Sequence, residues 1–276
     1  MPTYRGKRFT DASLLGLAKI ETIRHLALYD TAVTDDGLIA FAARAKRLMQ
    51  LHMSSARLTD RGLTAILNAC PIANLQIDDA PGVTDAVGPL IAEHEQIDEL
   101  YLNGTSIGDQ TAKAIEGMPN LWSFCADGTR ITDAGLASLG RMPELSNVSL
   151  EGTKVRGRGL QHLAALEGLY IYLQDCRVSD DEIGASLPHM TRMRLLSLSG
   201  TDVTDRGLES IGACRRLEDL RLSDTGITDA MLDILSELPE LQTLYVDGTR
   251  VTADRVSRLK MVKDDLTIYA TFDEDE

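Results

Sequence analysis

Aromatic residues and long apolar runs are scarce in this chain of 276 residues. Phe, Trp and Tyr together make up 4% of it. No stretch approaches the roughly 20 consecutive apolar residues that a membrane helix needs. Residues 1–8 are not followed by the apolar core of a secretory signal. We therefore expect a cytoplasmic protein that does not enter a membrane.

Cysteine is also rare, and its spacing excludes two kinds of site. Cys70, Cys125, Cys176 and Cys214 form no CxxC pair, and their scatter does not look like a disulfide framework. The histidines show no metal-ligand spacing either. We expect reduced thiols, no metal and no cofactor.

Basic residues are outnumbered, 28 against 42 acidic ones, so the formal net charge is −14. This excess repels the phosphates of nucleic acids, whose binding normally needs a net basic surface. We therefore expect neither nucleic acid nor an anionic membrane as a partner. The apolar share of 43% is sufficient for a continuous core.

What the chain has in quantity is a repeat with a period of 24 residues. Each copy opens with an apolar triplet such as Leu217-x-x-Leu220-x-Leu222, and the alternation predicts a short strand. About eleven copies can be counted. Gly or Asp and then Thr follow most strands, as in Gly200-Thr201, and predict a turn away from the sheet.

The second half of each copy reads Thr-Asp-x-Gly-Leu, as in residues 204–208. Thr is a good N-cap and Asp favours the positive end of a helix dipole, so a helix is expected to begin there. One copy cannot bury its own apolar face, whereas stacked copies share a core. We predict one domain over 1–276 with ten to eleven repeats. Residues 1–22 form a half-repeat cap, a lone helix, and 265–276 form the last strand and an acidic tail.

The string L-x-x-L-x-L-x-x-T-x-I/V-T-D-x-G-L resembles the leucine-rich-repeat family. It is most similar to bacterial Thr-type repeats and to the cysteine-containing repeats of F-box adaptors, in which a Cys closes the helix as Cys70 and Cys214 do here. The resemblance implies a right-handed α/β solenoid, a horseshoe with a parallel sheet on its concave side and helices on its convex side. It also implies non-enzymatic roles such as receptor, inhibitor or adaptor.

Side chains that flank the inward-facing leucines of each strand should face solvent on the concave side. Six of the seven tyrosines fall at such positions. Tyr is enriched at interfaces, although it also suits a half-covered strand. The predicted partner-binding residues are Tyr29, His52, Glu99, Tyr101, Asp127, Glu151, Tyr170, Tyr172, Asp219, Arg221, Tyr245 and Tyr269.

Charges near these strands suggest two further hypotheses. Carboxylates on the concave side would steer a basic partner, or they would only keep the protein soluble. A basic patch is predicted on neighbouring loops, either a specialised site or drift of the repeat. Its residues are Arg130, Lys154, Arg156, Arg158 and Arg177.

No nucleophile, base and orienting group fall together in the sequence, so we expect no enzyme. The predicted function is a protein-protein interaction scaffold that binds a macromolecular partner on its concave face. The alternative is a substrate-recognition subunit of a ubiquitin-ligase-like or other regulatory complex. The uncovered last strand predicts either a homodimer through that edge or a further segment downstream.

Overall fold

The computed structural model describes residues 2–20 and 22–272, and it alternates short strands with short helices. The strands are β1 (Thr3–Arg5), β2 (His25–Tyr29), β3 (Gln50–Ser54), β4 (Asn74–Asp78), β5 (Glu99–Tyr101), β6 (Ser123–Cys125), β7 (Asn147–Ser149), β8 (Tyr170–Tyr172), β9 (Leu195–Ser197), β10 (Asp219–Arg221), β11 (Thr243–Tyr245) and β12 (Thr267–Tyr269). The α-helices are α1 (Asp11–Leu17), α2 (Asp35–Ala42), α3 (Asp60–Ala69), α4 (Gly88–Ala92), α5 (Asp109–Ala114), α6 (Asp133–Leu139), α7 (Asp180–Ser186), α8 (Asp205–Leu208), α9 (Asp229–Ser236) and α10 (Ala253–Val262). The 3-10 helices are η1 (Asp85–Val87), η2 (Arg158–Leu163), η3 (Leu187–His189) and η4 (Ile211–Ala213).

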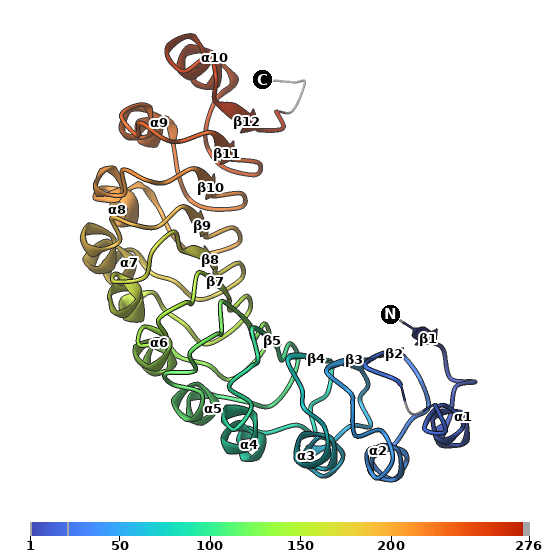
Figure 1. Cartoon of the computed structure of the whole chain (residues 1–276). Helices are drawn as coiled ribbons and strands as arrows, with labels where there is room; N and C mark the ends of the chain where they lie inside the picture. The colour runs from blue at the N-terminus through green and yellow to red at the C-terminus, as the bar shows by residue number, and fades with distance from the viewer. Residues whose placement is uncertain (1, 21, 273–276) are drawn as a thin grey trace. The chain divides into compact units, whose positions relative to one another are not determined.

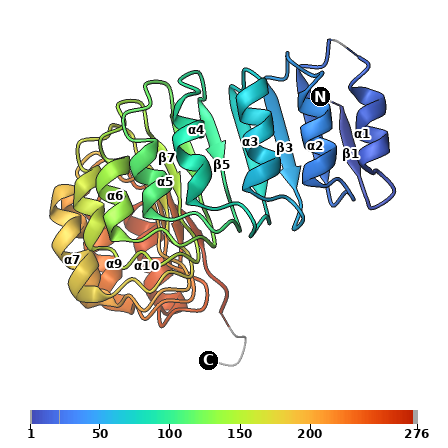
Figure 2. The same cartoon turned by 90° about the horizontal axis from the view of Figure 1, so that it is seen from below.

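The repeats form two compact units. Unit 1 contains the described residues up to 131 together with 141–145, and unit 2 contains 132–140 and the described residues from 146 onward. Strands β1–β6 belong to unit 1 and β7–β12 to unit 2. Within each unit, successive strands pair in parallel and the helices lie on one side of the sheet (Figures 1 and 2). The predicted α/β repeat architecture is confirmed, whereas the single domain stays a prediction.

Apolar side chains at matching positions of neighbouring repeats form the core. In unit 1, the strand register aligns Leu51, Leu75, Leu100 and Phe124, and all four are fully buried. Unit 2 repeats this pattern from β8 to β11. Burial of such a side chain contributes roughly 1.5–3 kcal/mol. Each repeat is therefore stabilised by the repeats on either side of it.

The turns that follow the strands use Gly or Asp because the backbone there is left-handed. Gly200 and Gly248 have φ values of 69° and 64°, and Asp175 and Asp224 take the same place at 56°. Gly has no Cβ to oppose this conformation, and Asp tolerates it better than most residues. The prediction from the Gly/Asp pattern is confirmed.

A buried Thr follows most of these turns, as after Gly200 and Asp224, and closes the turn. Its hydroxyl donates to the carbonyl three residues earlier, at 2.6 Å from Thr201 to Leu198. The same bond recurs from Thr105, Thr129, Thr153 and Thr225. In these five repeats the hydrogen bond satisfies a buried hydroxyl. The Thr31 hydroxyl has no such partner among the described residues, and Cys176 takes the Thr position in one repeat.

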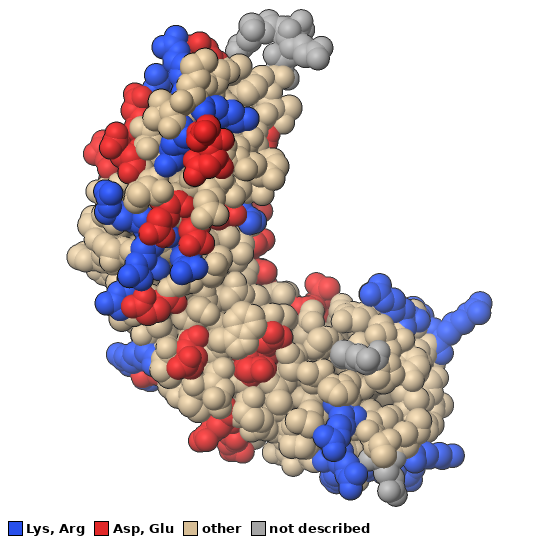
Figure 3. Space-filling view, turned by 45° about the horizontal axis from the view of Figure 1, so that its top comes forward, with Lys and Arg blue, Asp and Glu red and all other residues tan. Residues whose placement is uncertain are grey.

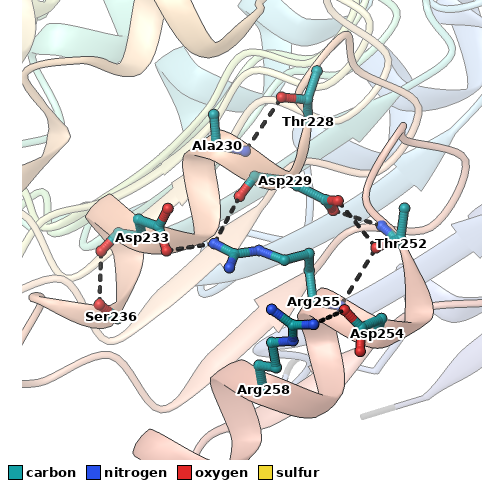
Figure 4. Close-up of polar contacts among 9 residues, drawn as sticks. All are labelled: Thr228, Asp229, Ala230, Asp233, Ser236, Thr252, Asp254, Arg255 and Arg258. Carbon is teal, nitrogen blue, oxygen red and sulfur yellow. Dashed lines mark hydrogen bonds and ion pairs between the residues drawn. The ribbon is translucent and has the colours of Figure 1, made fainter.

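In most repeats, the Asp that begins a helix joins its repeat to the next. In Figure 4, the carboxylate of Asp229 accepts hydrogen bonds from the backbone N–H (2.8 Å) and the hydroxyl (3.0 Å) of Thr252. We call this contact the Asp–Thr clamp. It recurs in Asp11–Thr34, Asp35–Thr59, Asp60–Thr84, Asp180–Thr204 and Asp205–Thr228. From the sequence, this Asp was predicted only to favour the positive end of the helix dipole, and the clamp was not predicted.

The Gly of the Thr-Asp-x-Gly-Leu motif leaves room for the clamp. A Cβ on Gly207 would lie 2.5 Å from Asp180 Oδ1 and 2.9 Å from the Asp180 Cα. A Cβ on Gly62 would meet Asp35 in the same way, at 2.4 Å. Two residues of the motif therefore act together. The Asp forms hydrogen bonds with the next repeat, and the Gly, which has no Cβ, lets the two repeats pack closely.

The first repeat differs from its prediction. Residues 1–22 were expected to form a lone helix, but β1 precedes α1 and pairs in parallel with β2. The half-repeat cap is therefore wrong. Its strand was missed because the apolar triplet is absent, and Tyr4 instead stacks on Phe9 at 4.5 Å between ring centroids. The last strand is confirmed as β12, and the acidic tail at 273–276 lies outside the described residues.

Candidate protein-binding face

The candidate site is the side of each sheet that carries no helix, which we call the open face. The strand register places the predicted residues there in columns. In unit 1 it aligns His52, Gln76 and Tyr101. In unit 2 it aligns Tyr172, Ser197, Arg221, Tyr245 and Tyr269. The columns predicted from strand alternation are thus found within each unit.

Unit 2 carries a group of stacked side chains on its open face. The Arg221 guanidinium lies over the rings of Tyr172 and Tyr245, at 5.6 and 5.2 Å from their centroids. Tyr245 stacks on Tyr269, with centroids 4.4 Å apart and ring planes 8° apart. We call Tyr172, Arg221, Tyr245 and Tyr269 the tyrosine–arginine cluster. Cation–π and ring contacts of this kind hold large side chains in one orientation.

Asp219 fixes the direction of the Arg221 guanidinium. Its two carboxylate oxygens accept from Nε at 3.0 Å and from Nη2 at 3.2 Å. These hydrogen bonds are the main cause that raises the pKa of Arg221. Partial burial opposes the shift, and the negative charge of Asp219 adds to it. The guanidinium has five N–H donors, of which this pairing uses two. The remaining donors can serve acceptors on a partner without new ordering of the side chain.

A small residue makes this arrangement possible. Ser197 lies in register between Tyr172 and Arg221 and is fully buried. Neighbouring strands are about 4.8 Å apart, so only a short side chain at this position lets Arg221 reach the Tyr172 ring. The Ser197 hydroxyl has no hydrogen-bond partner among the described residues. The contact between Arg221 and Tyr172 spans three strands, so the sequence of one repeat contains no signal for it.

The open face of unit 1 is polar instead. His52 Nε2 lies 2.7 Å from Asn74 Oδ1, and Asn74 Nδ2 donates to Glu99 Oε2 at 2.6 Å. At the end of β4, Asp78 accepts hydrogen bonds from Gln76 and Asn103. These side chains bond to one another across the strands. The predicted residues His52 and Glu99 therefore belong to a hydrogen-bonded ladder.

Tyr101 and Asp78 show how far this ladder is removed from water. Desolvation raises the pKa of Asp78 although Gln76 and Asn103 donate to its carboxylate. Desolvation is also the main cause that raises the pKa of Tyr101, whose hydroxyl lies 3.5 Å from Ser123 Oγ. Tyr29 lies under the Arg5 guanidinium, at 4.9 Å to its ring centroid. These predicted residues are half-buried, and part of each remains open to a partner.

The other predicted residues of the open face lie at its margins. Tyr170 is half-buried in the column beside Tyr172. Asp127 and Glu151 are half-buried where β6 and β7 end. Part of the carboxylate charge of the open face is neutralised, because Asp219 pairs with Arg221.

The structure divides the predicted basic patch. Lys154, Arg156, Arg158 and Arg177 are exposed on loops of unit 2. Arg156 pairs with Glu182 at 3.1 Å, so this part of the patch is partly neutralised. Desolvation would raise the pKa of Glu182, but hydrogen bonds from Ser179 and Arg156 and the charges of the arginines outweigh it and lower that pKa. Arg130 belongs to unit 1, where it lies 3.4 Å from the Ser106 hydroxyl.

The described residues offer little reactive chemistry. Burial raises the pKa of Cys70 to about 11 and that of Cys214 to about 12, so both stay protonated thiols at neutral pH. Residues 2–20 and 22–272 contain no group of three or more His, Cys, Asp or Glu side chains that could hold a metal ion. Within the same ranges, every helix is too short or too polar to cross a membrane.

Comparisons with known proteins agree with the repeat architecture. A family model described as a leucine-rich repeat matches residues 19–42 and 189–212. A search of curated proteins finds no match.

Several solved structures share the fold. An internalin from Listeria monocytogenes is 18% identical with a TM-score of 0.67, over 95% of this chain and 71% of that chain. A chain of the yeast Rad7 and Elc1 complex is 20% identical with a TM-score of 0.64, over 94% and 71%. The plant peptide hormone receptor RGFR1, solved with RGF2, is 14% identical with a TM-score of 0.54, over 93% and 41%. The repeats, the strand register and these structures together show that this chain has the leucine-rich-repeat fold.

Proposed function

We propose that this chain is a non-enzymatic scaffold that binds a partner protein on its open face, with the tyrosine–arginine cluster of unit 2 as the centre of the contact. The observation that carries the proposal is the ordered stack of Tyr172, Arg221, Tyr245 and Tyr269. Tyr and Arg are the residue types most enriched at interface hot spots. Side chains that are already ordered lose little conformational entropy when a partner binds.

The partner is expected to carry basic groups near the margins of this cluster. Besides Asp219, which is paired with Arg221, carboxylates lie at the ends of β7 and β11, namely Glu151 and Asp247, the latter accepting from the Thr271 hydroxyl. The whole chain has a net charge of −14, which would speed the approach of a basic protein. We propose that the carboxylates attract the partner and that the cluster provides most of the binding energy.

A second candidate is a subunit of a larger regulatory complex that recognises a substrate. Its support is the fold shared with a chain of the yeast Rad7 and Elc1 complex, at 20% identity. At that identity only the fold is common. The two candidates differ in whether a companion chain co-purifies in a fixed ratio with this one.

The test has two steps. The partner is first recovered by affinity purification with this chain from the native host, and its affinity for the wild type and for variants is then measured. Tyr172→Ala/Tyr245→Ala/Tyr269→Ala should weaken binding at least about tenfold, since loss of a hot-spot side chain costs on the order of 2 kcal/mol. Arg221→Ala should have a similar effect.

Arg206→Ala is the matched control. Arg206 also pairs with aspartates, Asp180 and Asp181, but it lies on α8, on the helix side of the sheet. It should leave binding unchanged. If the triple variant keeps its circular dichroism spectrum and still binds every partner as the wild type does, the open-face assignment is wrong.

A further inference from the structure

Charge is distributed unevenly along this acidic chain. Residues 1–61 contain 10 basic and 6 acidic side chains, whereas residues 62–276 contain 18 basic and 36 acidic ones. The first repeats are thus net positive and the rest is strongly negative. Such an asymmetry suggests a role for the positive region that differs from that of the open face.

Five of these basic residues gather on two neighbouring loops of unit 1. They are Lys19 and Arg24 between α1 and β2, and Arg44, Lys46 and Arg47 between α2 and β3. We call these five residues the basic ridge. All are exposed, and none forms an ion pair with another residue of the described ranges. Glu21, which lies outside those ranges, is the one acidic residue in the sequence of the two loops. Figure 3 shows Lys and Arg side chains gathered around the first repeats.

The helix dipole does not explain the basic ridge. Cations stabilise a helix when they lie in its last turn, and neither α1 nor α2 has a basic residue there. The corresponding loops of unit 2 also carry arginines, but two of these, Arg192 and Arg216, have an acidic partner. Glu167 pairs with Arg192 at 2.9 Å and with Arg216 at 3.1 Å. Among residues 2–20 and 22–272, the basic ridge has no acidic partner of this kind.

An apolar pocket lies beside the basic ridge. Its volume is about 340 Å³, and Pro2, Tyr4, Leu17, Ile20, Ile23 and Arg24 are among the residues that line it. Ile20 is 50% exposed, a high value for a large apolar side chain. Because Arg24 belongs to both features, an occupant of the pocket would meet the ridge. The two together fit an apolar side chain followed by carboxylates.

The chain itself contains a segment of that chemistry. Phe272 is 39% exposed, and Asp273, Glu274, Asp275 and Glu276 follow it in the sequence. We propose that the acidic segment 272–276 of a second copy binds at the basic ridge, with Phe272 in the pocket and the carboxylates against the ridge. The contact joins different surfaces of the two copies, so it is head-to-tail. It differs from the pairing of two β12 edges predicted from the sequence.

The net charge sets the strength of this association. Two copies of charge −14 repel each other at long range, and salt screens this repulsion beyond about 8–10 Å. The short-range contacts between ridge and acidic segment are screened less. We therefore expect a weak association that depends on protein concentration. This inference is independent of the open-face proposal.

The first experiment exchanges the charges of the two surfaces. One variant carries Arg44→Glu/Lys46→Glu/Arg47→Glu, and the other carries Asp273→Lys/Glu274→Lys/Asp275→Lys/Glu276→Lys. In sedimentation velocity over a concentration series, the wild type should self-associate and each variant alone should be monomeric. A mixture of the two variants should associate again, because the acidic ridge of the first variant can bind the basic C-terminal segment of the second.

The second experiment uses a labelled peptide of residues 264–276, which avoids the net repulsion. Fluorescence anisotropy should detect its binding to the full chain, and ridge reversal should weaken that binding at least about tenfold. Phe272→Ser in the peptide should also weaken it. The matched control reverses Arg192, Arg215 and Arg216 of unit 2 to Glu, which changes the charge equally and should leave binding unchanged.

Two outcomes would overturn the proposal. A wild type that sediments as a monomer at every concentration, together with a peptide that does not bind, excludes the contact. Self-association that survives ridge reversal places the interface elsewhere, for example at the edge of β12. Loss of partner binding at the open face is neither expected nor required in either case.

Discussion

At the scale of single residues, Asp180 shows how one carboxylate couples two repeats. It accepts from the backbone N–H and the hydroxyl of Thr204 at 2.8 and 2.7 Å, and Arg206 Nε lies 3.3 Å away. Burial would raise the pKa of Asp180, but the hydrogen bonds from Thr204 and the nearby guanidinium outweigh it. The pKa therefore lies below its ordinary value of 3.8. The charged form is the one that the folded protein stabilises.

Replacement of Asp180 by Ala should lower the free energy of unfolding by about 1–3 kcal/mol, because both Thr204 donors lose their acceptor. The measurement is urea denaturation at pH 7. Asp181→Ala is the control, since Asp181 is 82% exposed at its side chain and pairs only on the surface with Arg206. That change should cost less than about 0.5 kcal/mol. Equal losses in the two variants would refute the clamp.

The difference in stability between the wild type and Asp180→Ala should depend on pH. A carboxylate with a lowered pKa contributes stability above its unfolded pKa, and this contribution disappears as the pH falls through the folded value. The stability difference between wild type and Asp180→Ala should therefore be full at neutral pH and shrink on acidification below about pH 4. Denaturation curves at a series of pH values measure it. A difference that stays constant would mean that the carboxylate charge is not involved.

At the scale of elements, glycines set how closely successive helices pack. A Cβ on Gly140, at the end of α6, would lie 2.1 Å from the backbone oxygen of His162 in η2. A Cβ on Gly212, inside η4, would meet nothing within 4 Å. Neither residue has a positive φ. A difference in stability between Ala substitutions at the two positions therefore reflects packing and not backbone strain.

Gly140→Ala should destabilise the protein by about 1–3 kcal/mol, because the backbone of the next repeat has to move. Gly212→Ala should be neutral or should stabilise by up to about 1 kcal/mol, because it lowers the entropy of the unfolded chain. Thermal unfolding of both variants tests the pair. The packing argument fails if Gly140→Ala is tolerated as well as Gly212→Ala.

At the scale of the whole molecule, contacts join mainly neighbouring repeats. Leu220 lies between Leu196 and Leu244 in the strand register and is fully buried. In a repeat protein, stability is roughly the sum of each repeat and its interfaces with its neighbours. A cavity should therefore act locally.

Leu220→Ala should cost about 2–5 kcal/mol and should speed amide hydrogen exchange most in β9, β10 and β11. Exchange in β2–β4 of unit 1 should change least. Mass spectrometry of peptides from both units gives the comparison. A uniform rise over all strands would show instead that the chain unfolds as one cooperative unit.

The sequence by itself determined the architecture of this protein, because a strand alternation and a helix motif repeated every 24 residues are local signals. It predicted which side chains share the open face, and the register agrees. It missed β1, which lacks the apolar triplet, and it missed the partners of the motif residues. Only the tertiary structure decided that Asp180 binds Thr204 and that Arg221 lies between two tyrosine rings across Ser197. It also decided that Glu167 pairs with Arg192 and Arg216, whereas the basic ridge has no ion pair among the described residues. Those contacts depend on distances between repeats, which the spacing of residues along one chain does not contain.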